Sequence, residues 1–383
     1  MEKKFRRYDI DWLRVFVFSL LIIYHSGMFF VPWGWHIKNN NIYDWLKWPM
    51  LFLNQWRLPI LFLISGMGTF YALSKRNIWQ FNKERFLRLG IPLVFGMLVI
   101  VPPQVYFERL AQGQFQGSYW SYLSTIAYDG IYPEGNLSWH HLWFLPYLLV
   151  FSVLLSPFFL YMKNNKNRYI RWISKVIQKP YGLYIFTIPL YLLESLLEPF
   201  YDITHDLIND WFNFFSSMTL FFFGFVMVAC GPILWNAIER IRTKAFYLGI
   251  ICFIGMLITW QFEDGYTRHF TEAFLKIVNL WSWILVLLGY AAKYQNKPSP
   301  LLSYANRAVY PFYILHQTVT VGIAYYIKDL QWSLLLKATI LIVGTFLICW
   351  LIYHLIILKI KPLHPLFGLK KVFNYILCKK LNI

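Results

Sequence analysis

An arginine and a histidine stand in the first long apolar run of the sequence, where such residues are rare. His25 follows Arg14 by eleven positions, which at about 100° per residue returns to the same face of an α-helix, roughly 16 Å further along it. A polar group deep in a bilayer costs a few kcal/mol, so both residues are functional candidates. The imidazole could act as a general base, and the guanidinium could hold an anion.

Three more basic side chains occur inside later apolar runs. Arg57 lies well inside the second run, His316 lies near the middle of the ninth, and Arg307 lies close to the start of the ninth. Arg57 and His316 are the stronger candidates because of their depth. The plain alternatives are a histidine satisfied by a neighbouring hydroxyl or carbonyl, and arginines that snorkel to the lipid headgroups.

A short basic segment follows the second apolar run and carries Arg85 and Arg88 one helical turn apart. Taken alone, it reads as a solvated loop on the cytoplasmic side. With Arg14 and Arg307 nearby, the two arginines could form a pocket for the phosphates of a cytoplasmic ligand.

Signatures of common soluble enzymes do not accompany these residues. The sequence has no P-loop, HExxH, GxSxG or GxGxxG motif, so nucleotide hydrolysis, zinc proteolysis and nucleophile-elbow esterase chemistry are unsupported. His205 and Asp210 form an H-x(4)-D string like that of glycerolipid acyltransferases, but acidic residues recur there every four positions, like a solvated helix face. The cysteines lack metal-binding or disulfide spacing, so we expect no metal.

The elements that must position these residues are membrane-spanning helices. Of the 383 residues, 58% are hydrophobic and 14% charged, against about half and about a quarter in soluble domains. Apolar runs long enough to cross a hydrocarbon core of about 30 Å lie near residues 10–31, 48–73, 89–107, 142–162, 181–197, 211–235, 245–260, 273–292, 305–327 and 338–358. The sequence therefore predicts an all-α, polytopic bundle of about ten transmembrane helices.

The net charge of +18 encodes membrane orientation rather than a nucleic-acid partner. Basic residues gather in alternate connecting segments, which by the positive-inside rule places both termini in the cytoplasm. We expect one membrane domain over residues 1–361 and a basic amphipathic cytoplasmic tail over residues 362–383 that lies on membrane lipids. The longest connection, residues 108–141, is rich in aromatic residues and is expected on the outer face.

The pattern resembles the acyltransferase 3 family of integral membrane O-acyltransferases, and the resemblance leans to the branch with succinyltransferases of periplasmic glucan synthesis. Five motifs carry it in order: RYDIDWLR with His25, RLPILFLISG from residue 57, Arg85-x-x-Arg88 with Pro92, HLWFL at residues 141–145 and YPFYILH at residues 310–316. One departure is Trp12, which stands where many members have glycine.

The resemblance implies an enzyme of the bacterial plasma membrane. It would move an acetyl or succinyl group from cytoplasmic acyl-CoA to a hydroxyl of a surface or periplasmic glycan. His25 would be the general base on that hydroxyl, and Arg57 or His316 would stabilise the oxyanion. A covalent acyl-histidine is the competing mechanism.

The same resemblance implies two binding regions. Acyl-CoA phosphates would be held by Arg14, Arg85, Arg88 and Arg307. The acceptor would be received by Glu134, His140, His141 and Trp143, together with the aromatic outer connection.

A secondary transporter or flippase is the rival class, because it would also place arginine and histidine in the membrane as substrate or proton sites. A passive scaffold is the third class and leaves the buried cations unexplained.

Overall fold

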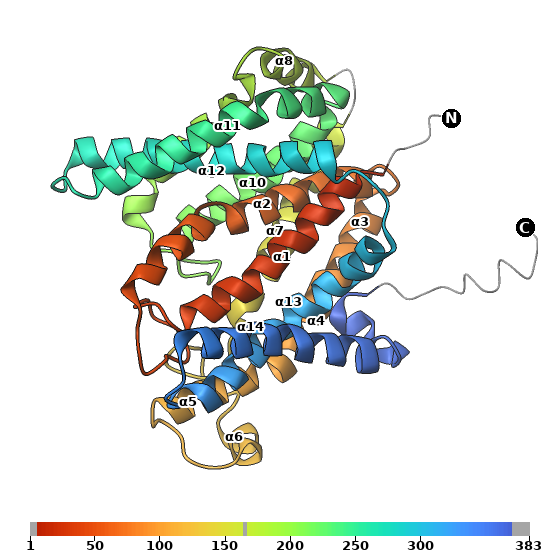
Figure 1. The fold of residues 1–383 in the computed structure, drawn as a ribbon. Helices are drawn as coiled ribbons and strands as arrows, with labels where there is room; N and C mark the ends of the chain where they lie inside the picture. The colour runs from red at the N-terminus through yellow and green to blue at the C-terminus, as the bar shows by residue number, and fades with distance from the viewer. Residues whose placement is uncertain (1–5, 164–166, 370–383) are drawn as a thin grey trace, which may run out of the picture. The chain divides into compact units, whose positions relative to one another are not determined.

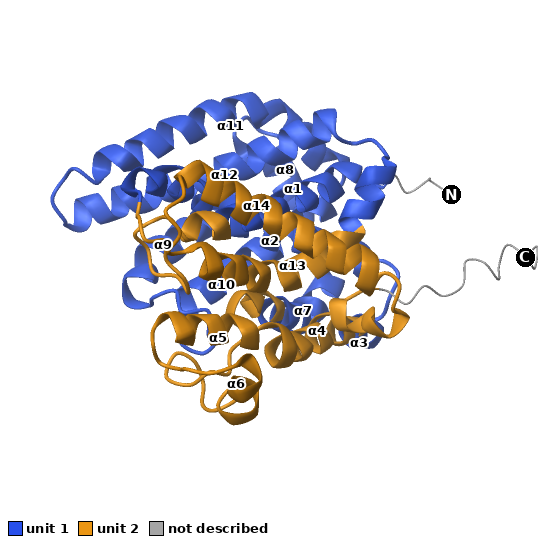
Figure 2. Cartoon of the chain, turned by 60° about the horizontal axis from the view of Figure 1, so that its bottom comes forward, with its two compact units in different colours: residues 1–24, 43–83, 146–306 blue, residues 25–42, 84–145, 307–383 orange. Residues whose placement is uncertain are grey.

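The computed structural model describes residues 6–163 and 167–369, and the chain is helical almost throughout these ranges (Figure 1). It forms two compact units, each assembled from segments far apart in the sequence (Figure 2). The first unit comprises residues 1–24, 43–83 and 146–306, and the second comprises residues 25–42, 84–145 and 307–383.

The described part of the chain contains nine helical segments that are long and apolar enough to cross a membrane. They are Tyr8–Met28, Asp44–Leu73, Ile78–Ala111, His140–Met162, Gly182–Phe200, Trp211–Ala229, Pro232–Thr259, Tyr266–Tyr294 and Leu334–Ile357. The expected tenth span, helix α13 (Pro300–Ile327), is not among these nine segments. It has 28 residues, but Arg307, His316 and Gln317 lower its mean hydropathy. The predicted all-α polytopic membrane bundle is confirmed, while the membrane side of each end stays a prediction.

Most of α1 (Tyr8–Met28) belongs to the first unit, and its last turn, from His25 onward, belongs to the second. The other helices of the first unit are α2 (Lys47–Leu73), most of α3 (Ile78–Arg85), most of α7 (Phe144–Met162), α8 (Arg168–Ile177), α9 (Thr187–Leu196), α10 (Trp211–Ala229), α11 (Pro232–Thr259) and α12 (Tyr266–Tyr294).

Helices α2 and α10 of the first unit cross at two glycines. A Cβ atom on Gly66 would lie 1.8 Å from the Phe221 carbonyl oxygen, and one on Gly224 would lie 1.9 Å from the Leu63 carbonyl oxygen. Small residues allow such backbone contact, which is a main source of helix association in membranes. The proline-aromatic-glycine stretch of the second run is therefore a packing surface.

The second unit contains α4 (Ile91–Phe95), α5 (Pro102–Ala111), α6 (Tyr119–Thr125), most of α13 and α14 (Leu334–Leu351). Two π-helical segments, Phe86–Gly90 and Gly96–Ile100, join α3, α4 and α5. The supposed loop around Arg85 and Arg88 is therefore helical, which corrects the sequence interpretation. At Gly96 a Cβ atom would lie 2.2 Å from Leu142, so this glycine admits the segment that carries His141.

Lys38 forms hydrogen bonds with backbone carbonyl groups at and after the C-terminal end of α1, within the second unit. Its Nζ donates to the carbonyl oxygens of Met28 and Trp33, at 2.6 and 3.0 Å, and also to that of Val31. A cation is favourable at a helix C-terminus because the last carbonyls lack partners. Burial lowers the pKa of Lys38 to about 8. These bonds fix the segment that follows His25.

The structure also describes residues of the H-x(4)-D string and the first residues of the predicted tail. Asp210 is fully buried and accepts hydrogen bonds from Tyr147 and Asn213, so the H-x(4)-D string is not part of a solvated helix face. Residues 362–369 of the predicted tail form 3-10 turns, and Phe367 packs on Phe95 with ring centroids 5.4 Å apart. Residues 370–383 lie outside the described ranges, so the amphipathic tail stays a prediction.

Candidate active site

Three histidines from distant segments meet in the second unit, and we call them the three-histidine cluster. His25 is in the last turn of α1, His141 is in the 3-10 turn His140–Trp143, and His316 is in the middle of α13. The ring centroids of His25 and His316 are 5.2 Å apart, and those of His141 and His316 are 5.1 Å apart. The His316 ring therefore contacts both of the other rings.

Backbone carbonyls fix which ring nitrogen carries hydrogen in His316 and in His141. His316 Nδ1 lies 2.8 Å from the Tyr313 carbonyl oxygen, which can only accept, so Nδ1 is the donor. In a neutral ring the lone pair is then on Nε2. The order is reversed in His141, whose Nε2 donates to the Ile314 carbonyl oxygen at 3.0 Å.

Neutral hydrogen-bond donors hold His141 in place. Gln104 Nε2 lies 3.4 Å from His141 Nδ1 and 2.7 Å from the Thr318 hydroxyl oxygen. Thr318 donates in turn to the Ile100 carbonyl oxygen at 2.6 Å, and the Tyr313 hydroxyl donates to the His141 carbonyl oxygen at 2.6 Å. His141 is thus oriented from α5 and α13 together.

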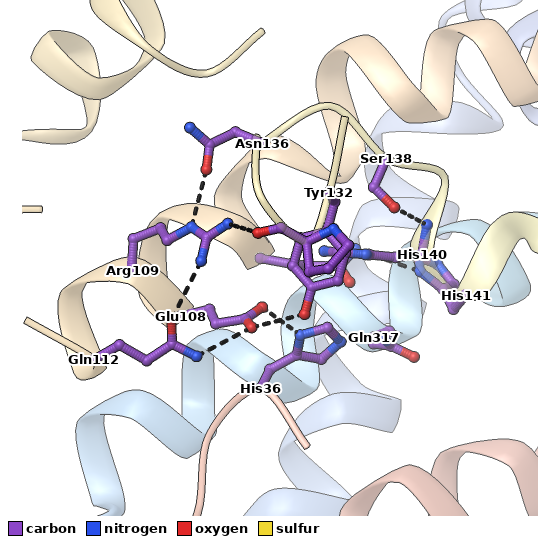
Figure 3. Close-up of polar contacts among 12 residues, drawn as sticks. His36, Glu108, Arg109, Gln112, Tyr132, Asn136, Ser138, His140, His141 and Gln317 are labelled. Atoms are coloured by element: carbon purple, nitrogen blue, oxygen red, sulfur yellow. Dashed lines mark hydrogen bonds and ion pairs between the residues drawn. The ribbon is translucent and has the colours of Figure 1, made fainter. Parts of the chain in front are cut away.

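A second cluster lies beside the first, and we call it the His36 cluster (His36, Glu108, Tyr132, His140 and Gln317; Figure 3). Its residues come from the segment after α1, from α5, from the long connection and from α13. His36 Nδ1 lies 2.6 Å from Glu108 Oε2, and the Tyr132 hydroxyl donates to Glu108 Oε1 at 2.9 Å. The His140 ring centroid is 4.7 Å from those of both His36 and Tyr132.

Consecutive residues connect the two clusters. His140 contacts the His36 cluster, while its neighbour His141 belongs to the three-histidine cluster. Gln317 Nε2 lies 2.9 Å from His36 Nε2, while its neighbour His316 contacts His25. A shift in one cluster therefore changes the backbone of the other.

Arg57 belongs to the first unit and is buried, with 3% of its surface exposed. Its Cζ lies 3.6 Å from the centroid of the Tyr24 ring, and its Nη2 lies 3.4 Å from Asn54 Oδ1. Its Nε is buried with no hydrogen-bond partner among the described residues. A guanidinium in this state has donor capacity to spare for a ligand, although its action together with His25 stays a prediction.

Arg14 also belongs to the first unit and takes part in a small polar network. Its Nη1 lies 3.3 Å from Asp11 Oδ1 and 3.3 Å from Asn306 Oδ1. Asn306 Nδ2 donates to the same Asp11 oxygen at 3.2 Å. The carboxylate offsets part of the charge that we expected to hold phosphate.

The other three predicted phosphate ligands, Arg85, Arg88 and Arg307, belong to the second unit. The Arg88 side chain is 48% exposed and lies 3.9 Å from the Glu84 carboxylate. Its carbonyl oxygen accepts a hydrogen bond of 2.9 Å from the Tyr310 hydroxyl, which ties the start of the third run to α13. A pocket formed jointly with Arg14 stays a prediction.

The predicted acceptor residues have different surroundings. Glu134 is exposed on a turn of the long connection, whereas His141 and Trp143 are buried in the 3-10 turn and His140 is half-buried. Trp143 packs on Phe144 with ring centroids 6.4 Å apart. Joint binding of an acceptor by these residues also stays a prediction.

Sequence reasoning missed the grouping of His36, Glu108 and Tyr132, and it considered Tyr132 only as one of the aromatic residues of the long connection. They lie 72 and 24 residues apart along the chain, so no spacing motif marks them. The available signal was composition: two of the three lie in the longest connection or at its start, next to the predicted acceptor residues.

Fold and site together define an integral membrane protein in which three histidines from distant segments meet. The profile of the family described as an acyltransferase domain, acyltransferase 3, matches residues 7–354. The chain therefore belongs to the acyltransferase 3 family and is an acyltransferase, which decides against the transporter and scaffold alternatives.

Relatives of known name agree with this assignment. Glucans biosynthesis protein C of Escherichia coli O1:K1 / APEC is 23% identical over 379 residues, covering 96% of this chain and 95% of the relative. The proteins of the same name from Escherichia coli O45:K1 (strain S88 / ExPEC) and Escherichia coli (strain K12) have the same identity and coverage. A comparison with solved structures gives no significant match.

Proposed function

We propose that this protein transfers an acyl group, acetyl or succinyl, from cytoplasmic acyl-CoA to a hydroxyl of an extracytoplasmic glycan. Family membership supports acyl transfer, and the name of the glucans biosynthesis protein C relatives, which span nearly the whole chain, favours a glucan acceptor. The observation that carries the catalytic part is the meeting of His25, His141 and His316 within one unit.

In this proposal His25 is the general base. It takes the proton of the acceptor hydroxyl as the oxygen attacks the thioester carbonyl carbon, and a tetrahedral oxyanion forms. Collapse of the tetrahedral intermediate breaks the carbon–sulfur bond. The CoA thiolate then takes the proton from the His25 imidazolium.

His316 and Arg57 assist in different ways. A neutral His316 has its hydrogen on Nδ1 and a lone pair on Nε2, so it suits a proton acceptor near His25 better than an oxyanion donor. Arg57 carries a guanidinium charge, and its buried Nε has no hydrogen-bond partner among residues 6–163 and 167–369, which suits it to the developing oxyanion. His141, held by Gln104 and by the Ile314 carbonyl, would orient the acceptor hydroxyl.

The donor and acceptor would reach this point from opposite sides of the membrane. Arg14, Arg85, Arg88 and Arg307 would hold the phosphates of CoA, and the extended pantetheine arm would carry the thioester toward His25. Glu134, His140 and Trp143, with exposed aromatic residues of the long connection such as Trp120, would bind the sugar by stacking and hydrogen bonding.

The donor and acceptor classes are tested by mass spectrometry of extracytoplasmic glycans from cells with and without this chain. The proposal predicts a mass difference of one acetyl or one succinyl group per modified sugar, which disappears when the chain is absent. Identical glycans in both strains, with the protein present in the membrane, would contradict it.

A further inference from the structure

We infer that His36, Glu108 and His140 bind one divalent transition-metal ion, and that Zn²⁺ fits their donor set best. Each residue offers one ligand atom, and these atoms all lie within 4.8 Å of one another. Two imidazoles and one carboxylate are a common ligand set for zinc sites that keep a fourth position open for water or substrate. The inference does not depend on the proposed acyl donor or acceptor.

The geometry needs only small adjustments to hold an ion. Zinc bonds of about 2.0–2.2 Å in a tetrahedron place ligand atoms roughly 3.3–3.5 Å apart. The His36 Nδ1 to Glu108 Oε2 separation of 2.6 Å would open slightly, and the wider separations within the cluster would close.

Burial makes the site suitable for an ion. The His36 and Glu108 side chains are 13% and 5% exposed. His140 Nε2 is buried and has no hydrogen-bond partner among the described residues. A buried polar atom left unpaired is destabilising, and coordination would give this nitrogen a partner.

Neighbouring polar groups already orient the carboxylate. The Tyr132 hydroxyl and the Gln112 side-chain amide both donate to Glu108 Oε1, at 2.9 and 3.3 Å. Glu108 Oε2 is left for His36 or for a metal ion, which is the usual arrangement around a bound metal.

Rotation of the Gln317 side-chain amide would allow His36 to coordinate a metal ion through Nδ1. Its Nε2 lies 2.9 Å from His36 Nε2, while its Oε1 is buried with no hydrogen-bond partner among the described residues. Rotating the amide by half a turn exchanges these atoms, so that Oε1 accepts a hydrogen from His36 Nε2 and Nδ1 is free to coordinate. The rotation gives the Gln317 Oε1 atom a hydrogen-bond partner.

The nearest cation is engaged elsewhere. The Arg109 guanidinium donates to the Pro133 and Gly135 carbonyl oxygens, at 2.7 and 2.8 Å, and its Nε donates to Asn136 Oδ1 at 2.9 Å. It holds the backbone of the long connection rather than the Glu108 carboxylate. A bound ion would join three segments, and through the His140–His141 and His316–Gln317 neighbours it would position the three-histidine cluster.

The direct test is the metal content of the purified full-length protein, with any polyhistidine tag removed. The inference predicts close to one Zn²⁺ per chain by mass spectrometry. After chelation, added Co²⁺ should give the intense visible absorption of a four-coordinate site. His140→Asn and Glu108→Gln should each weaken Co²⁺ binding at least tenfold. His354→Asn, which changes an exposed histidine stacked on Trp350, should bind as the wild type does.

A further variant keeps this test decisive if a ligand variant fails to fold. Tyr132→Phe leaves all three ligand atoms in place and should weaken Co²⁺ binding by about 10-fold or more through the loss of an outer hydrogen bond. Wild-type protein that elutes as a folded species but holds less than a tenth of an ion and gives no Co²⁺ absorption would overturn the inference, and the cluster would be a hydrogen-bond clamp only. Unchanged affinity in folded His140→Asn would overturn it equally.

Discussion

Proton position governs the chemistry of the buried histidines. His316 and His141 donate from opposite ring nitrogens to backbone carbonyls of α13, so their tautomers are set by the main chain. Side chains that hold this backbone are therefore positioning residues. Tyr313 is one of them, because its buried hydroxyl donates to the His141 carbonyl oxygen at 2.6 Å.

Tyr313→Phe should destabilise the protein by about 1–2 kcal/mol, because the ring is kept while a buried carbonyl loses its donor. Thermal unfolding in detergent measures this effect. Tyr161→Phe, at a residue 62% exposed, should leave the melting temperature unchanged. Equal melting temperatures for both variants would show that the Tyr313 hydroxyl does not hold the 3-10 turn.

Arg14→Gln should weaken the binding of CoA at least 10-fold, because a charge-assisted hydrogen bond contributes about 1.5–3 kcal/mol. The loss should shrink as salt rises, since it is largely electrostatic. Calorimetric titration of purified protein with CoA measures it, and Arg168→Gln on the exposed face of α8 is the matched control. If Arg14→Gln binds CoA with wild-type affinity, Arg14 does not bind CoA, and its role is to hold Asp11 and Asn306 in place.

At the scale of helices, close backbone contact and side-chain clamps position the site. The α2–α10 crossing places main chains against Gly66 and Gly224, which excludes any larger residue. In the second unit, α5 carries both Glu108 of the His36 cluster and Arg109, the clamp on the long connection. Helix α5 thus links the membrane-embedded site to the aromatic connection.

Gly224→Ala should destabilise the first unit by about 3 kcal/mol or more, because the new methyl group would overlap the Leu63 carbonyl of α2. Gly34→Ala adds the same methyl group where no atom lies within 4 Å, and it should be tolerated. Folded yield after detergent extraction and melting temperature compare the two. A normal melting temperature for Gly224→Ala would mean that the two helices lie further apart than described.

Arg109→Ala should loosen the long connection, since the Pro133 and Gly135 carbonyls and the Asn136 side chain lose their shared donor. Hydrogen–deuterium exchange over residues 129–136 should become faster. Arg268→Ala removes a similar bond, to the Phe262 carbonyl in the first unit, and should leave that exchange unchanged. An unaltered exchange rate in Arg109→Ala would mean that the turns within residues 129–136 keep this segment ordered without Arg109.

For the whole molecule, hydropathy was sufficient to predict the spans because membrane helices are selected by length and apolar content. It also singled out His25 and His316, which stand out against apolar neighbours and do come together. It could not predict the two π-helical segments or α8, which depend on packing and on local amphipathicity. Glu108 escaped notice because it ends an apolar run, where an acidic residue is unremarkable.

The assembly of the chain into two compact units explains why the His36 cluster could not be predicted from the sequence. Each unit combines segments from three parts of the chain, and spacing along the sequence does not reveal which segments meet. His36 and Glu108 pair only because the segment after α1 and the end of α5 belong to the same unit. The family motifs mark single helices, whereas the His36 cluster exists only in the folded chain.

The central claim is that His25 is the base for acyl transfer. The most direct measurement is transfer of a labelled acyl group from acyl-CoA to a glucan acceptor by purified protein, with His25→Ala compared with the wild type and with His354→Asn. The account predicts a loss of about 10²–10⁴-fold in His25→Ala, with unchanged melting temperature and with His354→Asn fully active. Transfer by folded His25→Ala within a few-fold of the wild-type rate would contradict it.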